Sequence, residues 1–250
     1  MESFSKMSAI DRYHSNLQSI LTSVFTEQRE TLEKVASLLC DCVTSGHFLY
    51  LFGTGHAHIL AEEMFYRAGG LAAVIPILDE PLMLHRSASG STNLERQTGY
   101  ASKLLAKYKM TAGDMLLVCS NSGRNTVPVE MAVEAKAKGV TVIALTNVRH
   151  SQSCTPRNPM NLRLMEAADI VLDNGGCIGD ASMEVGLPYK VGATSTAVCA
   201  AMLQAIESRC VELAVEKGLP IDVFSSSNVD SGDAINAKIL EKYQPLIDIL

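Results

Sequence analysis

The stretch Phe48-Leu-Tyr-Leu-Phe52, followed by Gly53-Thr54-Gly55, decides the fold class of this 250-residue chain. A continuous apolar run ends in two closely spaced glycines, and a helical pattern follows over 58–68. Short continuous apolar runs are typical of strands that are buried on both faces of a parallel sheet. The sequence therefore predicts a buried strand here, with a loop at its carboxyl end that leads into a helix.

The same pattern recurs along the chain. Further apolar runs lie at 73–78, 115–119, 141–145 and 169–172, and helical patterns cover 58–68, 93–108, 126–138, 161–167, 194–217 and 232–249. Strands that alternate with helices predict an α/β fold with a five-stranded parallel sheet flanked by helices. The run 73–78 has the weakest strand signal, because Pro76 has no N–H to donate to a neighbouring strand.

The two ends of the chain carry helical patterns of their own. Before Ser45-Gly46, apolar residues recur three and four positions apart, which predicts one long helix or a pair of helices with an apolar face. We therefore expect an N-terminal helical segment over 1–45 that packs on the domain or its partner, a central domain over 46–220 and a helical tail over 221–250.

The composition excludes several classes of protein. Apolar residues make up 47% of the chain and the net charge is −6, so we expect a globular protein with no nucleic-acid partner. No apolar stretch reaches the ~20 residues that span a bilayer, and the first residues do not form a signal peptide. We therefore expect a cytoplasmic chain with no membrane partner. The seven cysteines show no zinc spacing, which predicts buried thiols and no metal site.

The loop after the third apolar run carries the most specific signal. Its sequence is Ser120-Asn121-Ser122-Gly123-Arg124-Asn125-Thr126, and Pro128 follows in the first turn of a predicted helix. Hydroxyl groups, free backbone N–H groups and the helix dipole together suit a phosphate monoester. The alternative is ordinary capping of the helix by its Ser and Thr side chains.

Two other loops have features that suit an anion at the start of a helix. Gly53-Thr54-Gly55-His56 lets the backbone approach an anion at a helix start, although the dinucleotide pattern would need a glycine at His58. Asp79 could serve as a ribose ligand, so a nucleotide-cofactor enzyme remains an alternative. Gly192-Ala193-Thr194-Ser195-Thr196 is a hydroxyl-rich helix entry or a cap.

Taken together, the three loops resemble the SIS (sugar isomerase) domain of phosphosugar isomerases and phosphosugar-binding regulators. The stretches Leu60-Ala-Glu-Glu63 and Tyr66-Arg-Ala-Gly-Gly-Leu71 resemble a stand-alone bacterial-type branch, similar to sedoheptulose 7-phosphate isomerases and N-acetylmuramic acid 6-phosphate etherases. The resemblance implies a flavodoxin-like sheet, a phosphosugar at the strand ends, a dimer or tetramer, and no metal or cofactor for the chemistry. The serine usual in the first loop is Ala57 here, so that loop contributes N–H groups and His56.

The resemblance also implies which residues bind the phosphosugar. They are Gly53, Thr54, Gly55, His56, Ser120, Asn121, Ser122, Gly123, Arg124, Thr126, Thr194 and Ser195. We expect the chain to bind a phosphorylated sugar and to isomerise it between aldose and ketose. A phosphosugar lyase or etherase, and a phosphosugar sensor without turnover, remain alternatives.

Isomerisation and ether elimination both need a base and an acid close to the sugar. The candidate catalytic residues are Glu62, His56, Glu63 and Glu184. Glu62 lies four residues after His58 on one helix face, Glu63 is spaced to pair with Arg67, and Asp180 is a further acid near Glu184. Glu95 is interpreted as a charge at a helix start.

The apolar faces near both termini predict an assembly. The N-terminal stripe is long, and the tail adds Ile235, Ile239, Tyr243 and Ile247. Isolated amphipathic helices are marginal without a partner face. We therefore expect at least a homodimer with both terminal helices in the contact, the alternative being that both fold back on their own domain.

Overall fold

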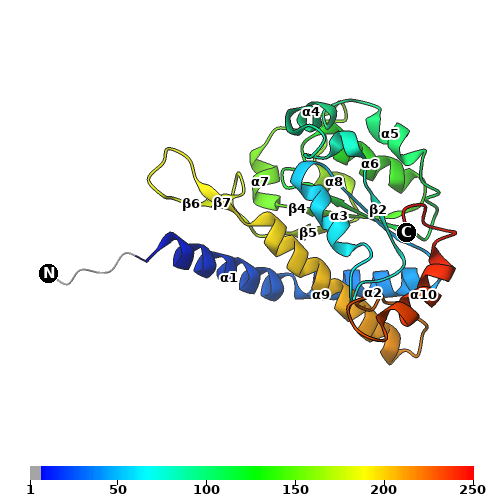
Figure 1. Ribbon diagram of the computed structural model, residues 1–250. Helices are drawn as coiled ribbons and strands as arrows, with labels where there is room; N and C mark the ends of the chain where they lie inside the picture. The colour runs from blue at the N-terminus through cyan, green and yellow to red at the C-terminus, as the bar shows by residue number, and fades with distance from the viewer. Residues whose placement is uncertain (1–6) are drawn as a thin grey trace.

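A five-stranded parallel sheet forms the centre of the protein in the computed structural model, which describes residues 7–250 (Figure 1). The strands are β1 (Leu49–Gly53), β2 (Val74–Ile77), β3 (Met115–Cys119), β4 (Thr141–Thr146) and β5 (Ile170–Asp173). Their order in the sheet is β2-β1-β3-β4-β5, which is the flavodoxin-like order. The predicted fold class is confirmed, and the predicted strands differ from the observed ones only at their ends.

Pro76 is tolerated because β2 is an edge strand. It lies opposite Leu51 of β1, and β2 has no neighbour on its other side in the described sheet. A strand at the edge needs hydrogen-bond donors toward one neighbour only.

Helices cover both faces of the sheet. The first face carries α2 (Arg29–Thr44), α3 (Ile59–Met64) and α9 (Ser195–Glu216), and Val24 near the end of α1 (Ala9–Glu27) joins the same core. Alternate strand residues point to this side, so that Leu51 and Leu117 pack with Leu39 of α2 and Met202 of α9.

The second face is covered by helices from the middle and the end of the chain. They are α5 (Tyr100–Leu105), α6 (Thr126–Ala137), α8 (Leu164–Ala167) and α10 (Gly232–Tyr243). Phe52 and Leu116 of the sheet belong to this core, and so do Ile239, Tyr243 and Ile247 of the C-terminal segment. The C-terminal helix therefore packs against its own domain.

Some predicted helices are shorter or divided. The pattern over 93–108 is broken into α4 (Ala88–Leu94) and α5, because Gly99 takes φ +76° and donates its N–H to Glu130. The helix predicted over 58–68 becomes a 3-10 turn, η1 (Gly55–His58), and α3. The tail helix ends at Tyr243, and α7 (Val148–Ser153) and the turn η2 (Glu80–Leu82) were not predicted.

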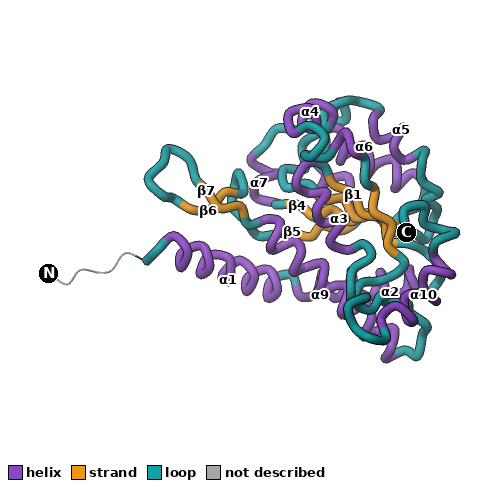
Figure 2. Tube along the Cα trace, viewed as in Figure 1, coloured by secondary structure: helices purple, strands orange, loops and turns teal. Residues whose placement is uncertain are grey.

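An arm projects from the sheet domain (Figures 1 and 2). It consists of α1 together with residues 178–193, which contain the antiparallel hairpin β6 (Ala181–Met183) and β7 (Val191–Ala193). The sequence predicted α1 but not the hairpin. None of the described helices is long and apolar enough to cross a membrane.

Candidate functional site

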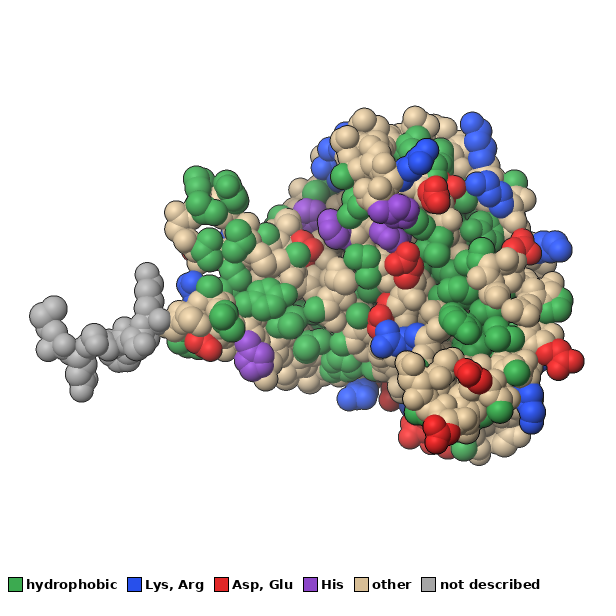
Figure 3. Space-filling model, viewed as in Figure 1, with side chains coloured by type: hydrophobic (Ala, Val, Ile, Leu, Met, Phe, Trp, Pro, Cys, Tyr) green, Lys and Arg blue, Asp and Glu red, His purple; other side chains and the backbone are tan. Residues whose placement is uncertain are grey.

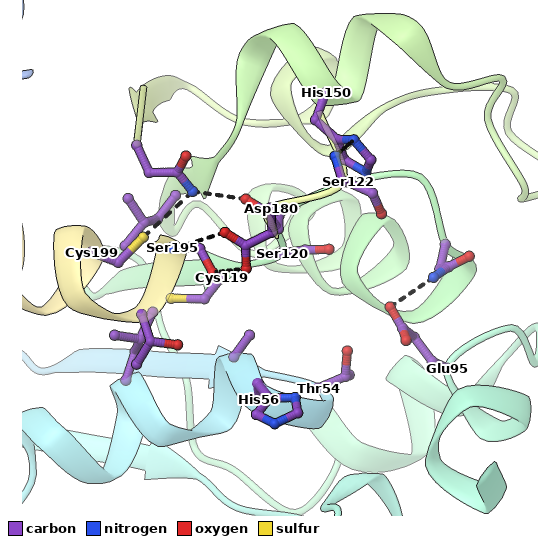
Figure 4. Close-up of a pocket in the computed structure, with 18 residues that line it drawn as sticks. Thr54, His56, Glu95, Cys119, Ser120, Ser122, His150, Asp180, Ser195 and Cys199 are labelled. Carbon is purple, nitrogen blue, oxygen red and sulfur yellow. Dashed lines mark hydrogen bonds between the residues drawn. The ribbon is translucent and has the colours of Figure 1, made fainter. Parts of the chain in front are cut away.

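A cavity of about 300 Å³ opens at the carboxyl ends of the strands. Its walls come from the loops after β1, β3, β4 and β5 and from the first turn of α9 (Figure 4). In parallel α/β sheets this is the edge where ligands bind. The volume lies at the lower end of the range for small-molecule sites.

Half of the predicted binding residues line this cavity. They are Thr54, His56, Ser120, Asn121, Ser122 and Ser195. Most of the remaining predicted binding residues determine the backbone conformation of the loops that form the cavity. A side chain at Gly53 would lie 2.5 Å from the backbone of Ala57, and Gly123 takes φ +57° with Leu164 close by. Gly55, Thr126 and Thr194 also lie outside the lining, the two threonines being buried.

The loop after β3 has backbone N–H groups that make no hydrogen bond within the described chain. Among residues 7–250, no acceptor pairs with the backbone N–H of Asn121 or of Ser122. Ser120 turns inward, where its hydroxyl accepts from the N–H of Gly123 at 3.3 Å, and α6 begins shortly afterwards. Free N–H groups beside a helix N-terminus favour an anion.

Arg124 belongs to the same loop but is not in the lining. Its backbone carbonyl accepts from Arg157 N–H, and its guanidinium contributes to the electrostatics of His150. Its Nε atom is buried and has no hydrogen-bond partner in the described chain.

Three asparagines hold the loops of neighbouring strands together. Asn174 donates to Asn121 Oδ1 at 2.8 Å, and Asn147 donates to Asn174 Oδ1 at 2.8 Å. Asn147 and Asn174 are almost completely buried. Each asparagine follows closely after a strand in the sequence. This shared position could have predicted from the sequence that the three side chains meet at the same edge of the sheet. Hydrogen bonds among buried side chains of this kind rigidify the loops around the cavity.

Asp180 joins the segment after β5 to α9. Its Oδ1 accepts from the N–H groups of Thr194 and Ser195 at 3.1 and 2.8 Å, and its Oδ2 accepts from the Ser195 hydroxyl at 2.6 Å. Asp180 has φ +67°, a conformation that aspartate tolerates better than most residues. The carboxylate thus caps α9 and complements its dipole.

His150 was not predicted, and it lines the cavity from α7. Its Nδ1 accepts from the N–H of Gly179 at 2.9 Å. Burial lowers the pKa of His150, the nearby Arg124 lowers it further, and Asp180 opposes both. The neutral ring therefore carries its proton on Nε2, a hydrogen-bond donor that lies 3.9 Å from Cys154 Sγ.

Glu95 also lines the cavity, and the sequence had suggested only a charge at a helix start. It follows α4 as its C-cap, and its Oε1 accepts from Asn125 at 2.9 Å. Figure 4 shows Glu95, His56 and His150 on different sides of the cavity. The site therefore combines two carboxylates, those of Glu95 and Asp180, and two imidazoles with the hydroxyl and N–H groups of the loops.

The three predicted catalytic carboxylates lie away from the lining. The Glu62 side chain is 53% exposed and 3.9 Å from His58 Nε2. Glu63 pairs with Arg67 at 2.6 Å, and Glu184 is 82% exposed on the hairpin. Of the predicted catalytic residues, His56 alone lines the cavity.

Two thiols complete the cavity wall. Burial raises the pKa of Cys119 and raises that of Cys199 to about 12, so both stay protonated and unreactive. Within residues 7–250, no three His, Cys, Asp or Glu side chains converge as metal ligands would.

Sequence comparison places the chain among known proteins. The SIS domain family matches residues 12–147. A UPF0309 protein of Halalkalibacterium halodurans is 42% identical over 237 residues, which cover 94% of this chain and 98% of that protein. A UPF0309 protein of Shouchella clausii is 41% identical over 95% of this chain and 98% of its own length.

Comparison of structures agrees on the fold. A phosphoheptose isomerase from Francisella tularensis superposes with a TM-score of 0.53 at 15% identity, covering 82% of this chain and 100% of that one. The family match and the similarity to UPF0309 proteins over nearly the whole chain are consistent with the sheet order and the loop motifs described above. We conclude that the chain belongs to the SIS domain family, where its relatives are UPF0309 proteins.

Proposed function

We propose that this protein binds a phosphorylated sugar in the cavity at the strand ends and isomerises it between aldose and ketose. The observation that carries the proposal is the convergence in one cavity of anion-binding donors with groups that can move protons. SIS family membership and a fold like that of a phosphoheptose isomerase support the choice of substrate class.

The phosphate end of the substrate is assigned to the loop after β3. The hydroxyl of Ser122 and the free N–H groups of Asn121 and Ser122 are offered at the cavity wall. Hydrogen bonds to a charged group are each worth ~1.5–3 kcal/mol, so a few such donors bind a phosphate without a lysine.

The sugar end is assigned to the opposite wall. Isomerisation removes a proton from the carbon beside the carbonyl and returns it to the neighbouring carbon, which needs a base, while an acid assists at the oxygen. Glu95 is the carboxylate that lines the cavity without being fully used in protein contacts, because Asn125 occupies only Oε1. We assign Glu95 as the base and the Nε2–H of His150 as the donor to the oxygen.

His56 remains a candidate for either role, and Glu62 remains the sequence-based prediction for the base. Glu62 starts from an exposed position beside His58, so it would have to turn toward the cavity. A phosphosugar etherase would use the same two roles, and a sensor would use the binding groups alone.

The test compares Glu95→Gln with Glu62→Gln. Calorimetry measures the binding of hexose, amino-sugar and heptose phosphates, and an isomerisation assay measures turnover of those that bind. We expect Glu95→Gln to keep binding and to lose about 10²–10⁴ in turnover, with Glu62→Gln near the wild type. The reverse pattern would assign the base to Glu62, and phosphosugar binding without turnover in the wild type would favour the sensor.

A further inference from the structure

Another cavity lies at the amino ends of the strands, the edge of the sheet opposite the candidate functional site. Phe48 and Asp114, which precede β1 and β3, line it together with Ile75 and Pro76 of β2. Its volume is about 450 Å³, which is within the range of small-molecule sites. This amino-end cavity shares no lining residue with the cavity at the carboxyl ends of the strands, so a ligand bound here is separate from the proposed sugar site.

The C-terminal segment over 245–249 forms one wall of the amino-end cavity. Ile247 is 2% exposed and anchors this segment in the core of the second face, whereas Leu246 and Ile249 are 57% and 56% exposed. In Figure 3, apolar side chains gather on the side of the molecule where Figure 1 marks the C-terminus, with charged side chains around them. The walls of the cavity are therefore largely apolar, and an anchored segment holds one of them in place.

A buried tyrosine brings an unpaired hydroxyl to the amino-end cavity. Tyr50 is 3% exposed, and its hydroxyl makes no hydrogen bond with any of residues 7–250. Its ring meets that of Tyr108 edge to face, with the ring centroids 6.2 Å apart. Burial raises the pKa of Tyr50, and the charge of Asp114 raises it further, so the hydroxyl keeps its proton. A buried donor without an acceptor is unfavourable, and an oxygen atom of a ligand would satisfy it.

The buried carboxylate of the amino-end cavity is already used by the protein. Asp114 Oδ1 accepts from the N–H of Phe48 at 2.9 Å and lies 3.3 Å from His47 Nδ1. Asp114 Oδ2 accepts from the N–H and the hydroxyl of Thr111 at 2.7 and 3.1 Å. These contacts occupy both oxygens, so Asp114 has little capacity left for a donor on a ligand.

The exposed charges of the amino-end cavity come from two lysines and one aspartate. Lys107 lies 3.2 Å from the buried Asp79, whereas no carboxylate among residues 7–250 pairs with Lys109. Asp248 of the C-terminal segment is exposed, and its charge opposes that of Lys109. An unpaired ammonium and an unpaired hydroxyl donor in one cavity suit a carboxylate, because an ionised carboxylate accepts hydrogen bonds and donates none.

We propose that the amino-end cavity binds a small aromatic carboxylate. Its ring occupies the apolar space lined by Phe48, Ile75 and Tyr108, and its carboxylate accepts from the Tyr50 hydroxyl and pairs with Lys109. Aromatic rings in the wall favour an aromatic ligand, since rings pack well edge to face. This binding goes beyond the proposed function and does not depend on it.

The experiment compares three probes of similar size on the full-length protein. Calorimetry measures the binding of 1-naphthaleneacetate, of its neutral amide and of the cation 1-naphthalenemethylamine. We expect the carboxylate to bind at least fivefold more tightly than the amide, and the amine to bind more weakly than either. NMR of isoleucine methyl groups locates the bound carboxylate. We expect the Ile75 signal to shift and that of Ile10 on α1 to stay in place.

Three substitutions test the assigned contacts of the carboxylate. Tyr50→Phe removes the hydroxyl and keeps the ring, and Lys109→Gln removes the charge. We expect each to weaken the binding of 1-naphthaleneacetate at least threefold, and Asp248→Asn to strengthen it. Tyr66→Phe and Lys138→Gln are the matched controls, because both side chains are exposed and lie outside the lining, and we expect no change in either. Circular dichroism and thermal unfolding show that each variant is folded.

Several results would overturn the proposal. They are no binding of the carboxylate by the wild type, equal affinities for the carboxylate and the amide, or a folded Tyr50→Phe variant with unchanged affinity. A loss of affinity in Ser122→Ala but not in Tyr50→Phe would place the probe in the other cavity and overturn it too. Binding of phosphosugars is measured separately, so a failure of the proposed function would leave this result unaffected.

Discussion

The carboxylate of Asp180 accepts a 2.6 Å hydrogen bond from the Ser195 hydroxyl, and it joins the glycine-rich segment after β5 to the first turn of α9. The same carboxylate also accepts two backbone N–H groups of that turn. One aspartate at the wall of the cavity therefore caps the N-terminus of a 22-residue helix. That helix contributes many side chains to the core on the first face of the sheet.

We expect replacement of Asp180 to destabilise the protein more than replacement of Ser195. Asp180→Ala leaves the capped N–H groups without their acceptor, and we expect it to lower the free energy of unfolding by ~1–3 kcal/mol. Ser195→Ala removes one of the three hydrogen bonds, and we expect a cost of ~1 kcal/mol. Urea unfolding measures both. Ser208→Ala on the exposed side of α9 is the control, and an equal cost for all three variants would contradict this account of the cap.

We expect removal of the Ser122 hydroxyl to weaken phosphosugar binding. The hydroxyl lines the cavity beside two free N–H groups, so we expect Ser122→Ala to cost ~1–2 kcal/mol, or about 5–30-fold in the dissociation constant. Calorimetry with a phosphosugar that the wild type binds measures the loss. Ser153→Ala removes an exposed hydroxyl of α7 outside the lining and serves as the matched control. Unchanged affinity in Ser122→Ala would remove this loop from the phosphate site.

The pKa of His150 depends on the charges of Arg124 and Asp180. Burial and Arg124 lower its pKa below the ordinary 6.5, and Asp180 raises it. We therefore expect Arg124→Gln to raise the pKa of His150 and Asp180→Asn to lower it further. NMR titration of the imidazole Cε1 protons measures these shifts, and His14, which no variant touches, is the internal reference. Shifts of the opposite sign would contradict the placement of these charges.

A buried glutamate outside the site makes stability depend on pH. Glu207 is 1% exposed, its Oε1 accepts from the N–H of Leu71 at 2.6 Å, and its Oε2 has no partner in the described chain. Burial raises its pKa from 4.5 to about 7, against the lowering effects of that hydrogen bond and of Arg67. The folded state therefore binds this proton more tightly than the unfolded state.

The sign of the effect follows from that difference. The contribution of Glu207 to stability is most favourable below pH 4.5 and is lost as the pH rises through about 7. The loss is about 3 kcal/mol for a shift of this size. We expect the unfolding free energy of the wild type, relative to Glu207→Gln, to fall between pH 5 and pH 7.5 in urea titrations. A difference that stays constant or rises over this window would contradict the buried, raised-pKa carboxyl.

The sheet was predictable from the sequence because its signals are local. Each strand is a short continuous apolar run, and a run such as Met115–Cys119 is buried throughout, as is typical of a strand in a parallel sheet covered on both faces. The hairpin was missed because its strands have three residues each and lean on Tyr13, some 180 positions away. The break at Gly99 was missed because it depends on the distant carboxylate of Glu130.

The sequence predicts the parts of the candidate site that are formed by the backbone of loops. It predicts less well the parts that are formed by single side chains from elsewhere in the chain. The loop Ser120–Thr126 shows its hydroxyls and its helix start in sequence order. Glu95 and His150 reach the cavity from α4 and α7, and nothing in their neighbourhood in the sequence shows the direction of their side chains. The spacing of His58 and Glu62 defines a helix face, but the sequence does not define which way that face turns.

The most direct test of the central claim is solvent-deuterium incorporation into phosphosugars. The protein is incubated in D₂O with a panel of hexose, amino-sugar and heptose phosphates, and NMR follows the protons at C1 and C2. The account predicts that at least one sugar exchanges one of these protons while its aldose and ketose forms equilibrate, and that Glu95→Gln, still binding that sugar, loses the exchange. A panel in which no sugar exchanges a proton, or an exchange that Glu95→Gln and Ser122→Ala both leave at the wild-type rate, would contradict it.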